Sequence, residues 1–252
     1  MWMETGRRAR IQARSGDPSW RVARLAGAQT AGSRRAAQRF AAMMQELISA
    51  FVTLFVTIDP AGLAPLFLAL TSGMSRSERR QVGGRASLIA FSILVLFAVA
   101  GTAILGVFGI TIHAFRIAGG LLLFTIAFEM VFERRRERQE TSARRAITAD
   151  DIRHIAVFPL AIPLLAGPGA ISATILLSGT FASVAGRLAL ILIVALNLAL
   201  TFAIFLVSER VDRLLGVTGR IVLSRLLGVI LAALAVQFVA DGVLALAATL
   251  LR

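Results

Sequence analysis

Long apolar stretches dominate the chain after about residue 45, and each has the length that crosses a membrane. A transmembrane helix needs about 20 consecutive, mainly apolar residues. Stretches of this kind lie at about 46–70, 87–108, 112–132, 153–178, 187–208 and 226–250. The pattern predicts an all-α integral membrane protein with six transmembrane helices.

The loops between the predicted helices differ strongly in charge. Loops one, three and five carry fifteen arginines, namely Arg76, Arg79, Arg80, Arg85, Arg134, Arg135, Arg136, Arg138, Arg144, Arg145, Arg153, Arg210, Arg213, Arg220 and Arg225. Only Arg116, Arg187 and Arg252 lie elsewhere after residue 43. Because cytoplasmic loops carry the excess of basic residues, we expect a multi-pass inner (plasma) membrane protein with loops one, three and five in the cytoplasm and both termini outside.

Composition supports this class and excludes several others. Apolar residues make up 57% of the chain and charged residues 16%, against about 45–50% and about 25% in soluble domains. Mean hydropathy is +0.80. The chain has no cysteine and no lysine, so thiol chemistry and the Gly-Lys phosphate loop of an ATP-driven pump carried by this chain alone are excluded. No metal or cofactor is expected.

Residues 1–43 differ from the rest, with nine arginines and only two acidic residues. We expect this extension to be disordered or untranslated, because Met43 and Met44 stand directly before the first apolar stretch. A transit peptide or a lipid-binding tail is the alternative. Without the extension the net charge falls from +13 to about +6 (18 arginines against 12 acidic residues), so it does not indicate a nucleic-acid partner. The predicted membrane domain is residues 44–252.

The membrane domain resembles itself at an offset of about 109 residues. The segment from Arg116 to Gly119 matches the segment from Arg225 to Gly228, and Asp59-Pro60-Ala61-Gly62 matches Gly167-Pro168-Gly169-Ala170. Two halves of three helices each, about 46–132 and 153–250, must cross the membrane in opposite directions. The sequence thus predicts two inverted repeats, the plan of many secondary transporters.

Proline placement marks corresponding points in the two halves. Five of the six prolines lie in predicted helices one and four, at Pro60, Pro65, Pro159, Pro163 and Pro168. Proline removes an N–H from the helical ladder, and adjacent glycines let the chain unwind. We therefore expect helices one and four to be discontinuous near Asp59 and Gly167, where inverted-repeat transporters bind substrate. Two independent kinks that only shape helix packing are the alternative.

Three segments resemble the MarC family of inner-membrane proteins: residues 51–67 (FVTLFVTIDPAGLAPLF), 115–120 (FRIAGG) and 158–171 (FPLAIPLLAGPGAI). The resemblance covers residues 44–252. It implies two inverted three-helix repeats, discontinuous first and fourth helices, and kinship with LysE-type exporters. Family members to which a function has been assigned resemble transporters of small neutral amino acids such as glycine and alanine. The resemblance implies that the segments at Asp59 and Gly167 form the binding region.

Broken helices offer groups that complement a zwitterion. The amides around Ala61–Leu63 and Gly169–Ile171 suit a carboxylate, and the carbonyls near Val56–Ile58 and Leu164–Ala166, with Asp59, suit an ammonium or a coupling cation. The predicted substrate-binding residues are Thr57, Asp59, Pro60, Ala61, Gly62, Gly167, Pro168, Gly169, Ala170, Ser172 and Asn197. Alternatively, Asp59 only caps a half-helix, Asn197 bonds to a neighbouring helix, and the hydroxyls bond their own backbone.

The sequence favours a carrier or exporter of a small neutral amino acid, or a similar small metabolite, that works by alternating access. A channel for a small solute or ion is the alternative. An intramembrane enzyme is disfavoured, because Asp59 and Asp241 lie at different predicted depths and His113 and His154 at opposite faces. A structural membrane protein is a further alternative. The expected partners are a small-molecule substrate and the lipid bilayer. Exact substrate, direction, coupling ion and oligomeric state stay open.

Overall fold

The computed structural model of the chain describes residues 19–134 and 155–250. The first eighteen residues, most of predicted loop three and His154 lie outside this part. Two compact units divide the chain, Met1–Ile48 and Ser49–Arg252, and the predicted substrate-binding residues all belong to the second. The described residues form helices, turns and bends.

Eight helical elements make up this part of the chain. In order they are α2 (Ser19–Ile58), α3 (Pro60–Leu70), α4 (Arg76–Val107), α5 (Ile112–Val131), the π-helical segment η1 (Ala156–Leu165), α8 (Pro168–Thr180), α9 (Val184–Leu206) and α10 (Ser208–Leu250). Capping side chains fix four of the starts, because Asp59, Ser75, Thr111 and Ser183 each accept a hydrogen bond from a first-turn amide.

The described residues contain five helical stretches that are long and apolar enough to cross a membrane: Phe40–Leu70, Arg76–Val107, Ile112–Val131, Val184–Leu206 and Ser208–Thr249. Segments η1 and α8 form a bent pair that passes the same test, which gives six spans if the pair counts as one. The predicted all-α membrane fold is confirmed. The inverted repeat and the discontinuity of the predicted first and fourth helices stay predictions, and Phe40–Leu70 counts as a single stretch by this test.

Three helices extend beyond the apolar windows seen in the sequence. Helix α4 begins at Arg76 and not near residue 87, and α10 begins at Ser208 and not near 226, with a kink at Gly216 (φ 56°, ψ −171°). Residues 19–43, expected to be disordered or untranslated, are helical within α2. Alanine and arginine are good helix formers, so these basic segments continue a helix that the apolar pattern alone does not show. A late translation start stays a prediction.

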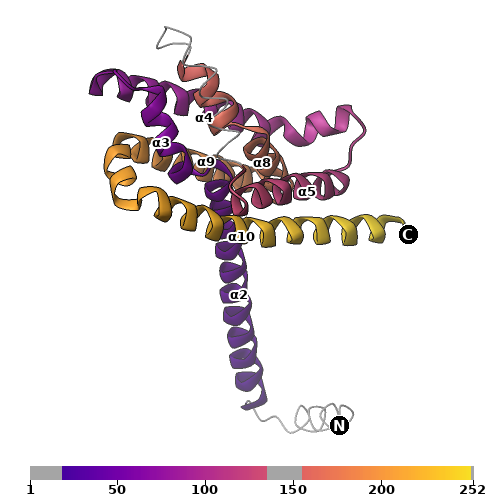
Figure 1. Cartoon of the computed structure of the whole chain (residues 1–252). Coiled ribbons are helices and arrows are strands. Elements are labelled where there is room, and N and C mark those ends of the chain that lie inside the picture. Colours follow the sequence, from indigo (N-terminus) through magenta and orange to yellow (C-terminus); the bar gives the residue numbers. More distant parts are fainter. Residues whose placement is uncertain (1–18, 135–154, 251–252) are drawn as a thin grey trace. The chain divides into compact units, whose positions relative to one another are not determined.

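Helices α5 and α10 lie side by side and form the most extensive contact between two described helices (Figure 1). Glycines make the close approach possible. A Cβ atom on Gly120 would lie 2.8 Å from Cγ2 of Val239, and one on Gly228 would lie 3.0 Å from Cβ of Met130. Small residues at such crossings are typical of membrane helices, because they let two backbones approach.

Helix α4 contacts α8, α9 and η1, while α3 contacts α9 and α10. Large apolar side chains on the outer faces of α4, α9 and α10 are exposed, among them Leu88, Leu96, Leu192, Leu196, Leu226 and Leu244. Apolar surface on this scale marks a protein that meets lipid and not water.

Candidate substrate site at two helix breaks

The first break is a single residue, Asp59, between α2 and α3. Its backbone is left-handed (φ 56°, ψ 62°), a conformation in which Asp is one of the few tolerated non-glycine residues. Its N–H still donates to the carbonyl of Phe55 at 2.9 Å. Pro60 then starts α3 at a position where no N–H is needed. The helix therefore ends and restarts within one residue.

The Asp59 carboxylate caps the restarted helix. Its Oδ1 accepts a hydrogen bond from the Gly62 amide at 3.1 Å, and the Asp59 carbonyl accepts one from Leu63 at 3.0 Å. A Cβ atom on Gly62 would overlap the Asp59 carboxylate, which explains glycine three residues after the break. The amides at Ala61–Leu63 were expected to be free. Those of Gly62 and Leu63 make the two bonds to Asp59, and that of Ala61 makes neither. Capping by Asp59, one of the two predicted roles, is thus present.

The second break lies at Ala166 and Gly167, between η1 and α8, whose axes are bent by 55°. Inside η1 the backbone is extended at Phe158 and Ile162, each directly before a proline, as steric contact with the proline ring favours. A Cβ atom on Gly167 would overlap the carbonyl oxygen of Pro163, so only glycine fits at this point. The break in the sequence pattern is therefore a real change of direction.

The two breaks differ in how their second half-helix begins. Gly167 stands at the cap position of α8 and provides no side-chain hydrogen bond. The first amides of a helix have no partner within it. The amides of Gly169 and Ala170 therefore form an uncapped, electropositive helix end, whereas Ile171 donates to the Gly167 carbonyl at 3.0 Å. One break presents a carboxylate and the other an uncapped helix N-terminus.

The breaks meet in the folded unit. A Cβ atom on Gly169 would stand 3.1 Å from Cγ2 of Thr57 and would overlap Cδ1 of Ile126 in α5. Thr57 and Gly169, which the sequence assigned to one site, therefore lie against each other. Ile126 was not predicted, because an isoleucine in an apolar helix carries no signal that distinguishes it from its neighbours.

The residues at both breaks are largely buried. Asp59 is only 4% exposed, and Thr57 and Gly169 are buried as well. Pro60, Gly167, Ala170 and Ser172 are also buried, Ala61 and Gly62 are half-buried, and Pro168 is exposed. A carboxylate within a membrane domain usually has a partner or a function, because its burial is costly.

Hydroxyl groups near the breaks mostly bond their own helices. Thr57 Oγ1 donates to the Thr53 carbonyl at 2.6 Å, and Thr174 Oγ1 donates to the Ala170 carbonyl at 2.7 Å. This was the alternative prediction for hydroxyls in membrane helices, and it is confirmed for these two.

Asn197 lies on α9, fully buried, and none of the contacts described at the two breaks involves it. Its Nδ2 donates to the Ile193 carbonyl in its own helix at 3.0 Å. Its Oδ1 is buried and has no hydrogen-bond donor among the described residues. A role in substrate binding stays a prediction for Asn197.

Helices of this length and hydropathy, with apolar faces turned outward and two buried breaks, define a polytopic integral membrane protein. The chain belongs to the MarC family: the sequence model of the MarC family integral membrane proteins matches residues 44–247. The predicted family is confirmed.

The chain is similar to membrane proteins from bacteria and archaea. It is 43% identical over 198 residues to a UPF0056 membrane protein of Archaeoglobus fulgidus, covering 77% of this chain and 90% of that protein. It is 34% identical over 200 residues to YvbG of Bacillus subtilis (79% and 95%) and 35% identical over 200 residues to YhcE of Escherichia coli (77% and 89%), both named UPF0056 membrane proteins. No solved structure matches the chain.

Proposed function

We propose that this protein is a secondary transporter that carries a small neutral amino acid, or a similar small metabolite, across the inner membrane by alternating access. The substrate binds between the breaks at Asp59 and Gly167. The observation that carries the proposal is the contact between Thr57 and Gly169, because it places two chemically different helix breaks next to each other inside the membrane domain.

The unequal chemistry of the breaks supports a zwitterionic substrate. An uncapped helix N-terminus attracts a carboxylate through its free amides and its dipole, and α8 begins in this way. The Asp59 carboxylate attracts an ammonium group. To cap α3, its Oδ1 accepts one hydrogen bond, from the Gly62 amide. An amino acid satisfies both ends at once. Ile126 and Thr57 pack closely against Gly169 and leave little space there, which favours glycine or alanine over larger substrates.

The register of α5 against α10 supports the inverted repeat. Gly120 lies against Val239, while Gly228 lies against Met130, so the two helices are antiparallel. The repeat offset of about 109 residues relates the two contacts. Added to the number of Gly120, it gives a position within one residue of Gly228, and subtracted from the number of Val239, it gives that of Met130. A contact that maps onto its own counterpart in this way is what a pseudo-two-fold axis between the halves requires.

Ion pairs between helix ends support the predicted topology. Arg79, from predicted loop one, pairs with Glu209, from predicted loop five, at 2.6 Å. Glu133, at the predicted cytoplasmic end of α5, pairs with Arg225 of α10 at 2.5 Å. Both pairs join residues that the charge distribution assigns to the same side of the membrane.

The buried breaks correspond to a closed conformation in this proposal. Substrate reaches the site only when Thr57 and Gly169 separate, and rocking of the two halves then exposes the site to one side of the membrane at a time. The discontinuities at Asp59 and Gly167 supply the joints, since the backbone there already departs from a continuous α-helix.

Counterflow in proteoliposomes tests the proposal. Vesicles containing the purified full-length protein and loaded with unlabelled glycine or alanine should accumulate the labelled amino acid saturably, with a wider metabolite panel run in parallel. Asp59→Asn, which keeps a capping side chain but removes the charge, should reduce exchange roughly tenfold or more, the expected loss for one charge-assisted hydrogen bond. Asp241→Asn, at an exposed residue bonded to Gln237, is the matched control.

Three outcomes would contradict parts of the proposal. Flux that does not saturate and shows no exchange would indicate a channel. Exchange of other metabolites without glycine or alanine would remove the substrate class. Exchange by Asp59→Asn at the wild-type rate would exclude the Asp59 carboxylate from the site.

A further inference from the structure

A second site candidate lies away from the helix breaks, where predicted loops one and five come together. A cavity of about 490 Å³ opens there between the ends of α3 and α9 and the starts of α4 and α10. Its lining residues are Phe67, Arg76, Arg79, Arg80, Phe205, Leu206, Val207, Ser208, Glu209 and Arg210. The volume falls within the usual range for a small-molecule site, about 300–1,000 Å³.

The cavity has an apolar inner part. The rings of Phe67 and Phe205 stack with their centroids 4.4 Å apart and an interplanar angle of 6°, and both side chains are at most 2% exposed. Leu206 and Val207 add exposed apolar surface beside them. A ligand that enters the cavity therefore contacts apolar side chains in its inner part and charged side chains at its rim.

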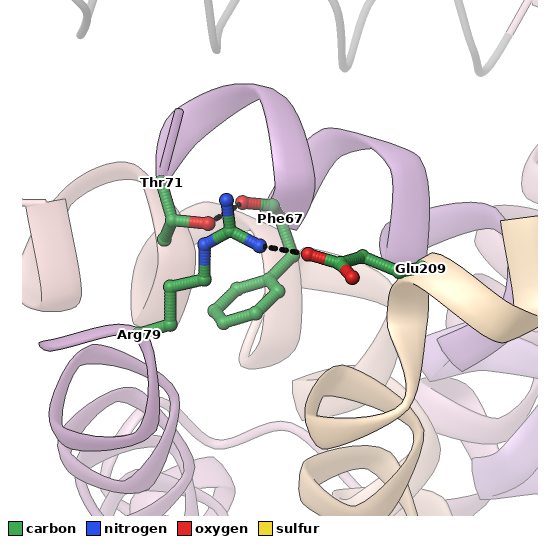
Figure 2. Close-up of polar contacts among 4 residues, drawn as sticks. All are labelled: Phe67, Thr71, Arg79 and Glu209. Carbon is green, nitrogen blue, oxygen red and sulfur yellow. Dashed lines mark hydrogen bonds and ion pairs between the residues drawn. The ribbon is translucent and has the colours of Figure 1, made fainter. Parts of the chain in front are cut away.

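The rim carries four guanidinium groups and one carboxylate, a balance of three positive charges, from Arg76, Arg79, Arg80, Arg210 and Glu209. Arg76, Arg80, Glu209 and Arg210 are exposed, and Arg79 is half-buried. Figure 2 shows the Arg79 guanidinium beside Phe67, with one of its amino groups directed at Glu209. Like charges gathered around one cavity repel each other, so an anion there would stabilise the arrangement.

Arg79 is the group that an anion would engage most directly. Its Nη1 is bound to Glu209 at 2.6 Å, but its Nε is buried and has no hydrogen-bond acceptor among the described residues. A buried donor without an acceptor is destabilising, and a ligand oxygen would satisfy it. Positive-inside charge alone explains arginines near a membrane surface, but it does not explain a half-buried guanidinium that lines a cavity and has a buried donor without an acceptor among the described residues.

We propose that this cavity binds a phosphate-type oxyanion, with Arg79 as the central contact and Arg76, Arg80 and Arg210 at the rim. Arginine suits phosphate because its planar fork donates two parallel hydrogen bonds. The headgroup phosphate of an anionic phospholipid matches the combination of a cationic rim with an apolar floor, and basic pockets between membrane helices are a known setting for such headgroups. Free inorganic phosphate shares the same chemistry.

Binding to the full-length protein in a neutral detergent tests the site and separates the two sources. One arm titrates inorganic phosphate at constant ionic strength, and the other titrates phosphatidylglycerol against phosphatidylcholine in nanodiscs or mixed micelles. Thermal stabilisation is the readout in both. We expect phosphatidylglycerol, and more weakly phosphate, to stabilise the protein, with roughly tenfold loss of affinity for each of Arg76→Gln and Arg79→Gln.

Two matched variants make the test specific. Arg85→Gln removes the same charge from the same helix at an exposed residue that does not line the cavity, and should leave affinity unchanged. Glu209→Gln removes the carboxylate that competes for Arg79, and should raise affinity. Binding of phosphate without phosphatidylglycerol would support the oxyanion site with a soluble source. Equal stabilisation by both lipids together with no phosphate effect, or equal loss in Arg79→Gln and Arg85→Gln, would overturn the proposal whatever the transport assay shows.

Discussion

The backbone of Gly169 lies directly against the side chain of Thr57, so that a Cβ atom at position 169 would stand 3.1 Å from Cγ2 of Thr57. The contact joins the end of α2 to the start of α8, more than a hundred residues later in the chain. It is the point at which the two halves of the proposed transporter touch across their breaks.

Gly169→Ala should destabilise the protein by about 1–3 kcal/mol, the usual range for overpacking. The new methyl group would overlap Cδ1 of Ile126 and press on Thr57. Ile126→Val removes that Cδ1 atom, so the double variant should recover part of the loss. Thermal unfolding in detergent measures the effect. Additive losses in the double variant would show that Ile126 does not restrict position 169.

Asp59→Ala and Asp59→Asn should differ in stability. Alanine loses the cap, about 1 kcal/mol, and must also hold a left-handed backbone, which costs roughly 1–2 kcal/mol more. Asparagine accepts the Gly62 hydrogen bond and tolerates that backbone, so Asp59→Asn should unfold within a few degrees of wild type. Differential scanning fluorimetry distinguishes the two. If both variants unfold alike, the cap does not stabilise the first break.

Gly120→Ala and Gly228→Ala should both weaken the α5–α10 contact, by about 1–3 kcal/mol each. The added methyl group at position 120 would stand 2.9 Å from the Ala235 carbonyl oxygen, and at position 228 it would stand 3.1 Å from that of Ala127. Backbone atoms cannot rotate away. Gly106→Ala is the control, because nothing lies within 4 Å of its Cβ position. Unequal losses at positions 120 and 228 would argue against a symmetric interface.

Phe67→Ala and Phe205→Ala should each cost about 3–5 kcal/mol, as for other buried phenylalanines. Their double-mutant cycle should give a coupling energy of about 0.5–1.5 kcal/mol, because the rings stack on each other. The free energies of unfolding of the four proteins provide the measurement. A coupling near zero would mean that the rings contribute only through separate burial.

Local chemistry in the sequence predicts the points at which α2 is followed by α3 and η1 by α8. Asp59-Pro60 and Gly167-Pro168 each combine a residue that tolerates an unusual backbone conformation with a proline, which cannot continue a helix. Both effects on the backbone extend over only a few residues. Apolar windows located the membrane helices for a similar reason, since the requirement for about 20 apolar residues is local. The starts of α4 and α10 are not visible in the sequence, because basic helical residues look like loop residues in a hydropathy window.

Contacts between distant segments could not be read from the sequence. Arg79 and Glu209 are 130 residues apart, and nothing in either flank indicates that they pair. Phe67 and Phe205 are two of 16 phenylalanines in an apolar chain, so their stacking carries no sequence signal. The arginines of predicted loops one and five are evident in the sequence, but loop charge by itself indicates only orientation.

A disulfide across the breaks is the most direct test of whether the two breaks separate during transport. The chain has no cysteine, so Thr57→Cys/Gly169→Cys introduces the only pair, and the close approach of these two residues suits a disulfide. If the breaks separate during transport, the oxidised double variant should stop glycine or alanine counterflow, reduction should restore it, and each single variant should be insensitive to oxidation. Counterflow at an unchanged rate in fully crosslinked protein would contradict a transport cycle in which these two breaks separate.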